Sequence, residues 1–109
     1  MVNECRCLRG EPRPSTTIAD LGEGPQHAEV WVYRCQLCGR LWLRVLYAAE
    51  QYTKAGHWYD ALLDATEQAE QLTIADVDRI FEQASYRLTG GSYYDGEVLP
   101  WNGLPKRLV

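Results

Sequence analysis

The sequence predicts one small domain of the α+β class: a β-hairpin extended into a small antiparallel sheet, with one main helix in the C-terminal half packed on it. Three observations predict this fold. Residues 28–35 and 41–47 alternate between two faces with the period of a strand, and residues 73–88 carry an apolar stripe with the period of a helix. The chain of 109 residues has room for one domain (1–109), and its 46% hydrophobic content with four tryptophans is typical of a folded protein.

Residues 10–26 are predicted to form a long loop, because Pro, Gly, Ser and Thr are concentrated there. A loop of this length in a compact domain usually has its ends tied or has a function of its own. Cysteines on both sides of the segment could supply the tie.

The hairpin is expected over residues 28–47. In its first strand Val30 and Val32 fall on one face, and aromatic residues fall on the other. Residues 41–47 repeat the alternation, and the turn between the strands contains Gly39. The β-branched and aromatic content of both strands supports the assignment.

The segment after the hairpin fits two structures. Residues 53–56 read as a turn, whereas residues 57–63 match both the alternation of a strand and the start of a helix. We favour a third strand that ends near Leu63.

The clearest helix is predicted over residues 73–88, where Ile74, Val77, Ile80, Phe81, Ala84 and Leu88 form one apolar stripe. Thr73 can cap its N-terminus, with Asp76 three residues later completing a capping box. Gly90 and Gly91 can adopt the left-handed conformation that ends a helix. Residues 90–109 are expected to form turns that carry aromatic anchors.

Four cysteines occur as two close pairs, Cys5 with Cys7 and Cys35 with Cys38. In a tetrahedral zinc site of four thiolates, two such pairs contribute two sulfurs each. At a hairpin tip, Cys35 and Cys38 can point the same way, and Gly39 tolerates the positive φ that lets backbone N–H groups approach the sulfurs. These residues are therefore predicted to hold one zinc ion.

Residues 5–47 resemble a zinc ribbon, a family of zinc-binding hairpins. The resemblance implies that all four cysteines bind zinc and that the ion is structural; such an ion contributes on the order of 10 kcal/mol of apparent binding energy to folding. One feature departs from the family, because zinc ribbons usually have two residues between both pairs and Cys5 and Cys7 are separated by one. If one thiol does not bind, His27 or His57 is the expected substitute.

Two other roles for the cysteines remain open. A disulfide framework is typical of exported proteins, and we identify no export signal; a ring closed between Cys5 and Cys7 would also be strained. Buried or redox-active thiols are the second alternative, but a redox pair usually lies at a helix N-terminus, and the flanks of Cys35 and Cys38 read as strands.

We expect a protein without catalytic activity. A zinc ion with four thiolate ligands has no open position for water, and using every cysteine on the metal removes the nucleophilic thiol. The two histidines lie in no recognisable catalytic motif, and no carboxylate spacing selects an acid and base pair. No segment has the length and hydrophobicity of a membrane span, so we expect a cytoplasmic protein.

Charge is distributed unevenly along the chain. Residues 1–56 carry seven basic and six acidic side chains and residues 57–109 carry four and nine, so +1 and −5 give the net charge of −4. Such a surface attracts basic partners and repels phosphate backbones. The predicted contact surface combines the carboxylates of the acidic segment with C-terminal aromatic residues: Asp60, Asp64, Glu67, Glu70, Asp76, Asp78, Glu82, Tyr93, Tyr94 and Trp101.

These features predict a zinc-binding protein-interaction module with a basic protein partner. In size, charge and lack of catalytic groups the chain resembles the immunity proteins that neutralise bacterial toxins. The alternative is a nucleic-acid-associated or transcription-related zinc ribbon, in which Arg34, Arg40 and Arg44, interleaved with Trp31, Tyr33 and Trp42, would bind single strands by stacking. A pI near 5.1 lacks the basic footprint of an autonomous nucleic-acid binder.

Overall fold

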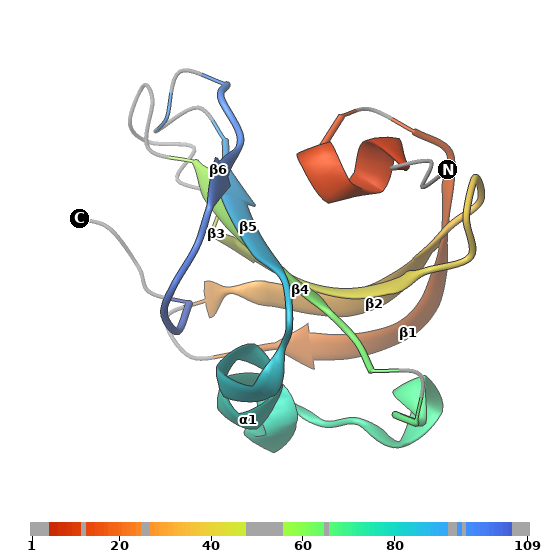
Figure 1. The fold of residues 1–109 in the computed structure, drawn as a ribbon. Helices are drawn as coiled ribbons and strands as arrows, with labels where there is room; N and C mark the ends of the chain where they lie inside the picture. Colours follow the sequence, from red (N-terminus) through yellow and green to blue (C-terminus); the bar gives the residue numbers. More distant parts are fainter. Residues whose placement is uncertain are drawn as a thin grey trace.

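A computed structural model describes residues 5–11, 13–24, 27–47, 56–64, 66–91, 94 and 96–105. Six antiparallel strands form one sheet in sequence order, so each strand pairs with the next along the chain (Figure 1). The strands are β1 (Ser15–Glu23), β2 (Glu29–Cys35), β3 (Leu41–Tyr47), β4 (His57–Leu62), β5 (Arg87–Gly90) and β6 (Leu99–Pro100). The described residues also form three short 3-10 turns, η1 (Arg6–Arg9), η3 (Ala69–Gln71) and η4 (Ile74–Asp76), and one helix, α1 (Val77–Gln83).

The predicted α+β class and the hairpin are confirmed. Strands β2 and β3 pair over the expected residues, with Val32 opposite Leu43 and Tyr33 opposite Trp42. The favoured third strand is also confirmed, because β4 pairs antiparallel with β3 along its whole length. The predicted turn at residues 53–56 lies outside the described residues except for Gly56.

The prediction of a loop over residues 10–26 is wrong for most of that segment. Residues 15–23 form β1, which pairs with β2 from Ser15 opposite Cys35 to Glu23 opposite Glu29. The register shifts twice along this pair, and Gly22 has a φ of 89°. Because β2 offers a full row of backbone donors and acceptors, pairing with it outweighs the loop-like composition of the segment.

The predicted helical segment begins as expected, at Ile74, but its first turn is the 3-10 turn η4 and α1 ends early. Thr73 and Asp76 form the predicted capping box, in which the Thr73 backbone N–H donates to Asp76 Oδ2 at 2.9 Å. The helix ends at Gln83, since Ala84 is extended with ψ of 136° and the Phe81 carbonyl accepts a hydrogen bond from Arg87 Nη1 at 2.7 Å.

Leu88, Gly90 and Gly91 therefore do not have the roles predicted for them. Leu88 lies in β5 opposite Asp60, and Gly90 lies opposite Trp58. A Cβ atom on Gly90 would come within 2.6 Å of the Trp58 ring, so this glycine is required for close packing within the sheet. The expected C-terminal turns also contain a short strand, β6, which pairs with β5.

The sheet is covered on both faces. Helix α1 lies on one side of it, and the sheet curves around η1 on the other (Figure 1). The α1 face buries Ala28, Val30, Val32, Leu43, Val45, Tyr59, Ala61, Leu63, Ala69, Val77, Ile80 and Phe81. The η1 face buries a smaller cluster of Cys7, Tyr33, Cys35, Trp42 and Leu88.

Candidate metal centre

The turn between β2 and β3 orients the second cysteine pair. Gly39 N–H donates to the Cys35 carbonyl at 2.8 Å, and Cys35 N–H donates to the Arg40 carbonyl at 2.9 Å. Gly39 has a φ of 81°, the left-handed conformation predicted from the sequence. Cys35 is fully buried at the end of β2, whereas Cys38 is exposed at the tip of the turn.

The first cysteine pair lies at the start of η1. Cys5 precedes the turn in extended conformation, and its carbonyl accepts the Leu8 N–H at 3.0 Å. Gly10 ends the turn with a φ of 68°. The change from extended backbone at Cys5 to a tight turn at Cys7 brings both sulfurs to one side with a single residue between them.

The four thiols form one cluster. The Sγ atoms of Cys5 and Cys35 are 3.5 Å apart, as are those of Cys7 and Cys38, and all four lie within 4.8 Å of one another. A Zn–S bond of about 2.3 Å in tetrahedral geometry requires sulfurs separated by about 3.8 Å. The cluster therefore has the donors and the spacing for one tetrahedral ion. All four cysteines are free thiols, so the predicted alternative of a disulfide framework does not describe this fold.

The pKa values of two thiols differ widely across the cluster. Burial, together with the neighbouring Cys38 thiol, raises the pKa of Cys7 to about 12. Burial also acts to raise the pKa of Cys38, but hydrogen bonds from the Arg40 backbone N–H and side chain lower it to about 6. Cys38 is thus a thiolate at neutral pH, and a metal would have to displace a proton from Cys7.

Groups around the sulfurs are placed to support bound thiolates. The Trp42 side chain is fully buried, and its indole Nε1 has no conventional hydrogen-bond partner in the described part of the chain. This indole N–H interacts with Cys7 and acts to lower the pKa of that thiol. A buried donor beside a sulfur fits a metal-bound thiolate, which accepts hydrogen bonds more strongly than a neutral thiol.

The two histidines lie outside the cluster. His27 is exposed with a φ of 62°, and its Nδ1 pairs with Glu23. His57 is buried at the start of β4 and stacks on Tyr47 with ring centroids 4.9 Å apart. Cys5 and Cys7 both reach the cluster although only one residue separates them. Neither histidine is therefore needed as a substitute ligand.

The predicted partner surface loses one residue in the fold. Asp60 is fully buried in β4, where Arg44 Nε and Nη2 donate to its two carboxylate oxygens at 2.7 and 2.8 Å. A carboxylate in this position is not available to a partner, so its assignment to the contact surface is wrong.

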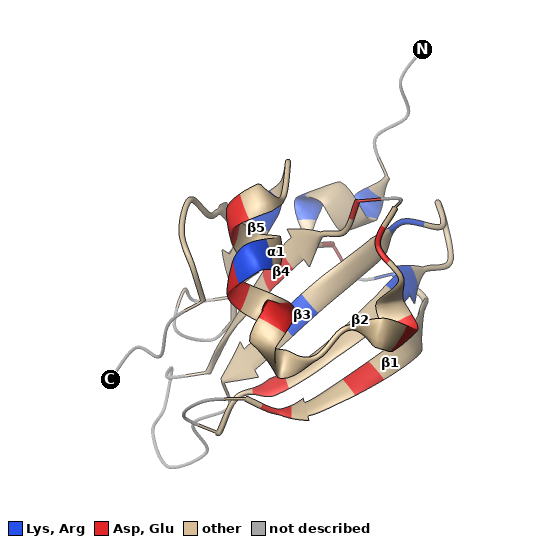
Figure 2. Cartoon of the chain, turned by 90° about the horizontal axis from the view of Figure 1, so that it is seen from below, with Lys and Arg blue, Asp and Glu red and all other residues tan. Residues whose placement is uncertain are grey.

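The remaining predicted surface residues differ in availability. Arg79 pairs with Glu67 at 2.8 Å and with Asp76 at 3.5 Å, while the exposed carboxylates are Asp64, Glu70, Asp78 and Glu82. Figure 2 shows the same mixture, with acidic segments beside a basic one on α1. Tyr94 and Trp101 are half-buried, Trp101 packing on Tyr59 with ring centroids 5.0 Å apart. Tyr93 lies outside the described residues.

The residues predicted for nucleic-acid stacking are mostly occupied by other contacts. Trp42 is fully buried, Tyr33 is 4% exposed, and Arg44 is bound to Asp60. Trp31 alone of the three aromatic residues is half-buried, and Arg34 is exposed.

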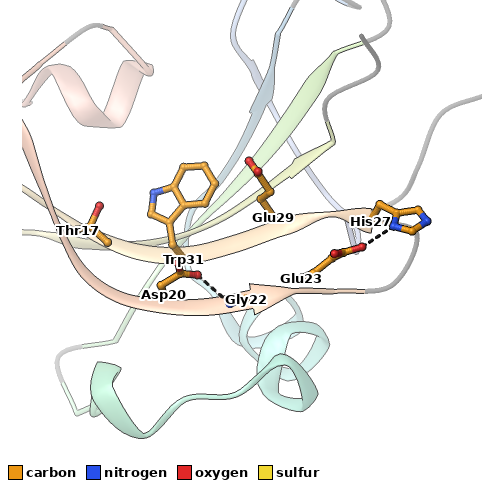
Figure 3. A pocket seen from close by; sticks show the side chains of 7 residues that line it. All are labelled: Thr17, Asp20, Gly22, Glu23, His27, Glu29 and Trp31. Atoms are coloured by element: carbon orange, nitrogen blue, oxygen red, sulfur yellow. Dashed lines mark hydrogen bonds and ion pairs between the residues drawn. The ribbon is translucent and has the colours of Figure 1, made fainter. Parts of the chain in front are cut away.

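An acidic hollow between β1 and β2 was not anticipated from the sequence. Its lining includes Asp20, Glu23, Glu29, His27 and Trp31 (Figure 3). Glu23 lies directly opposite Glu29 in the strand register, an arrangement of like charges that costs stability. These carboxylates come together only because β1 pairs with β2, and the sequence had indicated a loop where β1 lies.

Comparison of the chain with protein-family models, curated proteins and solved structures finds no match. Within the described part of the chain, no helix has the length and hydrophobicity needed to cross a membrane.

Proposed function

We propose that the four cysteines bind one structural zinc ion and that the domain is a non-catalytic protein-interaction module. The observation that supports the zinc site is the convergence of four sulfurs within 4.8 Å of one another. A set of four soft thiolate donors suits zinc, and four protein ligands leave no position for a reacting water.

The ion would join two parts of the chain that are distant in sequence. Cys5 and Cys7 flank the beginning of η1, whereas Cys35 ends β2 and Cys38 lies in the β2–β3 turn. Further contacts join the same regions, since Tyr86 Oη donates to the Leu8 carbonyl at 2.6 Å and Gln36 N–H donates to the Pro14 carbonyl at 3.0 Å. In this proposal zinc fixes the N-terminal turn against the sheet.

Elemental analysis of the purified full chain tests the site. We expect one zinc per chain, release of the metal by a strong chelator, and loss of binding in Cys35→Ser. A chain purified in zinc-containing medium that carries no metal would contradict the proposal. Cobalt substitution adds a second readout, because tetrahedral cobalt thiolate sites absorb visible light strongly.

We further propose that the partner is a basic protein, with a bacterial toxin neutralised by an immunity-type inhibitor as the specific case. The support is the net charge of −4 and the exposed carboxylates Asp64, Glu70, Asp78 and Glu82. Charge complementarity of this kind accelerates association and makes it sensitive to salt.

The partner proposal is tested with the protein encoded beside this gene, purified and titrated by calorimetry. We expect affinity to fall between 50 and 300 mM NaCl and to fall further in the double variant Asp78→Asn/Glu82→Gln. The matched control Glu97→Gln removes an exposed carboxylate from another part of the surface and should bind normally. Salt-independent binding, or equal loss in both variants, would contradict a contact surface centred on α1.

Nucleic-acid association is the competing function, and it predicts a different result. Single-stranded oligonucleotides would then bind with an affinity that falls in Arg34→Ala/Arg40→Ala. Binding of oligonucleotides in this manner, together with no binding to the basic protein, would favour the nucleic-acid function over the proposed one.

A further inference from the structure

A pocket of about 310 Å³ opens on the η1 face of the sheet, next to the metal centre but separate from it. Its lining residues are Gly10, Arg13, Ser15, Trp31, Tyr33, Arg44 and Trp58. This volume lies near the lower end of the range for small-molecule sites, about 300–1,000 Å³. The pocket is therefore large enough for one ring with a small substituent.

The floor of the pocket is a buried polar network. Asp60 is fully buried and accepts two hydrogen bonds from Arg44 and one from Tyr33 Oη at 2.6 Å. Arg13 completes the network, with Nη2 donating to Tyr33 Oη and lying 3.9 Å from Asp60 Oδ2. Arg13 Nη1 donates to the Glu11 carbonyl at 3.0 Å.

The network has more positive than negative charge. Two guanidinium groups, with side chains 7% and 22% exposed, face one carboxylate. Burial and the neighbouring Asp60 raise the pKa of Tyr33, so the phenol keeps its proton and adds no negative charge. The Glu11 carboxylate is engaged by Arg9 at 2.8 Å. Among the residues that the structure describes, one positive charge is left without a counter-charge in a poorly solvated place, which is costly.

The network is also short of one hydrogen-bond acceptor. Arg13 Nε is buried and has no partner among the described residues. Buried guanidinium donors are normally satisfied, so an unpaired one indicates a missing acceptor.

The aromatic walls exclude a cationic ligand. Arg44 itself lies 4.3 Å from the Trp58 ring centroid and 5.3 Å from that of Tyr33, so it already occupies the ring faces that attract cations. Trp31 lies opposite Arg44 in the strand register, and its ring stands up from β2 on this face of the sheet (Figure 3). This half-buried indole provides a flat apolar wall beside the charged floor.

We propose that this pocket binds a small planar monoanion, with an aromatic carboxylate as the ligand class. The carboxylate supplies the acceptor that Arg13 Nε lacks and the negative charge that balances the two guanidinium groups, and the ring packs against Trp31. The ligand class is argued without the identity of the metal or the partner, but Gly10 and Arg13 belong to the N-terminal segment that the metal is proposed to hold, so the titrations use the metal-loaded chain.

Titration of the full chain with benzoate tests this proposal, followed by tryptophan fluorescence and calorimetry. Benzamide, benzylamine and inorganic phosphate serve as the neutral, cationic and dianionic comparisons. We expect saturable binding of benzoate, at least about 10-fold tighter than each of the other three, because only benzoate combines one negative charge with a flat ring. Equal binding of benzoate and benzamide, or preference for benzylamine or phosphate, overturns the ligand class.

Two variants locate the site. Arg13→Met leaves the Arg44–Asp60 pair neutral as a unit, and we expect it to weaken benzoate binding at least about 10-fold. The matched control Arg34→Met removes an exposed arginine of β2 that does not line the pocket and should leave benzoate affinity unchanged. If thermal melting shows that Arg13→Met does not fold, Trp31→Ala provides the second test, with an expected loss of about fivefold or more from the missing stacking wall. Wild-type affinity in a folded Arg13→Met or in Trp31→Ala overturns the proposal.

Discussion

The two faces of the sheet are stabilised by different physical means. On the α1 face the buried cluster is almost wholly apolar, and Phe81 and Tyr59 are fully excluded from solvent. On the η1 face, thiols and an ion-pair network occupy positions that a hydrophobic core would otherwise fill. The first face gains stability from burial alone, whereas the second depends on charges having partners.

In this small domain the buried charged groups and the thiols lie on one face of the sheet, and the apolar core lies on the other. The α1 face supplies cooperative stability, and the η1 face can therefore contain groups that are costly to bury. The metal cluster and the proposed anion pocket both lie on the η1 face, and both involve the N-terminal segment. Stability of that face is expected to be conditional on metal, on proton concentration and on intact ion pairs.

Metal removal should have the largest effect. Loss of a structural zinc costs on the order of 10 kcal/mol of apparent stability, so Cys7→Ser or chelation should unfold the η1 side or the whole domain. Hydrogen exchange measured by mass spectrometry separates these outcomes, with protection lost first in η1 and the β2–β3 turn. Uniform loss of protection on both faces would show that they fold as one unit.

Breaking the buried ion pair should rank next. Asp60→Asn leaves Arg44 without its counter-charge, and we expect the free energy of unfolding to fall by about 3–5 kcal/mol. The double variant Arg44→Met/Asp60→Leu should recover only part of this loss, because it removes both charges of the pair but leaves the buried Arg13 guanidinium without Asp60. Urea unfolding of the wild type, Arg44→Met, Asp60→Leu and the double variant measures the coupling, and additive losses would show that the pair makes little direct contribution.

Phe81→Ala tests the opposite face. Truncation of this fully buried ring should cost about 3–5 kcal/mol through lost burial and the cavity left behind. Zinc content of the folded fraction should remain at the wild-type level, since the cysteine cluster lies across the sheet. Metal loss in a folded Phe81→Ala protein would show that the two faces are more tightly coupled than their packing indicates.

Removal of the capping hydroxyl should have a smaller effect. Thr73→Ala is expected to lower the free energy of unfolding by about 1 kcal/mol, because the helix loses one N-terminal hydrogen-bond partner. Thr17→Ala, in β1, removes an exposed threonine outside the helix and serves as the control. Thermal unfolding compares the two variants, and an equal shift in both would argue against a capping contribution.

Thiol reactivity should change with pH without a large change in fold. In metal-free protein Cys38, with a pKa near 6, should be alkylated at pH 7 about 100-fold faster than buried Cys7, whose pKa is near 12. Compared with an ordinary thiol the gain should be only several-fold, because a low pKa also lowers nucleophilicity. The rate should fall as the pH drops below about 6, where the thiolate is protonated.

The lowered pKa of Cys38 also makes the stability of the metal-free fold depend on pH. A depressed pKa means that the Cys38 thiolate stabilises the metal-free fold above the ordinary value of 9.0, and this contribution is lost as pH falls toward 6. Mass spectrometry of iodoacetamide adducts from pH 5 to 9 checks the order of reactivity. Protection of all four thiols after zinc addition is the expected control.

The features that the sequence determined are those set by near neighbours. Alternation in β2 and β3 depends on the two-residue period of a strand, and the capping box depends on residues three apart. The closeness of Cys35 and Cys38 follows from a turn whose conformation Gly39 permits. The spacing of the cysteines was sufficient to predict all four thiols as metal ligands.

Tertiary structure alone decided the features that depend on distant contacts. Strand β1 forms because β2 offers its edge, and the helix ends at Gln83 because the chain from Arg87 is needed as the next strand of the sheet. Asp60 is buried because Tyr33 and Arg44, from two other strands, meet it on one face. The energies of such long-range contacts outweigh local conformational preferences. Composition reports only the local preferences, and for this reason it wrongly indicated a loop over residues 10–26 and a surface position for Asp60.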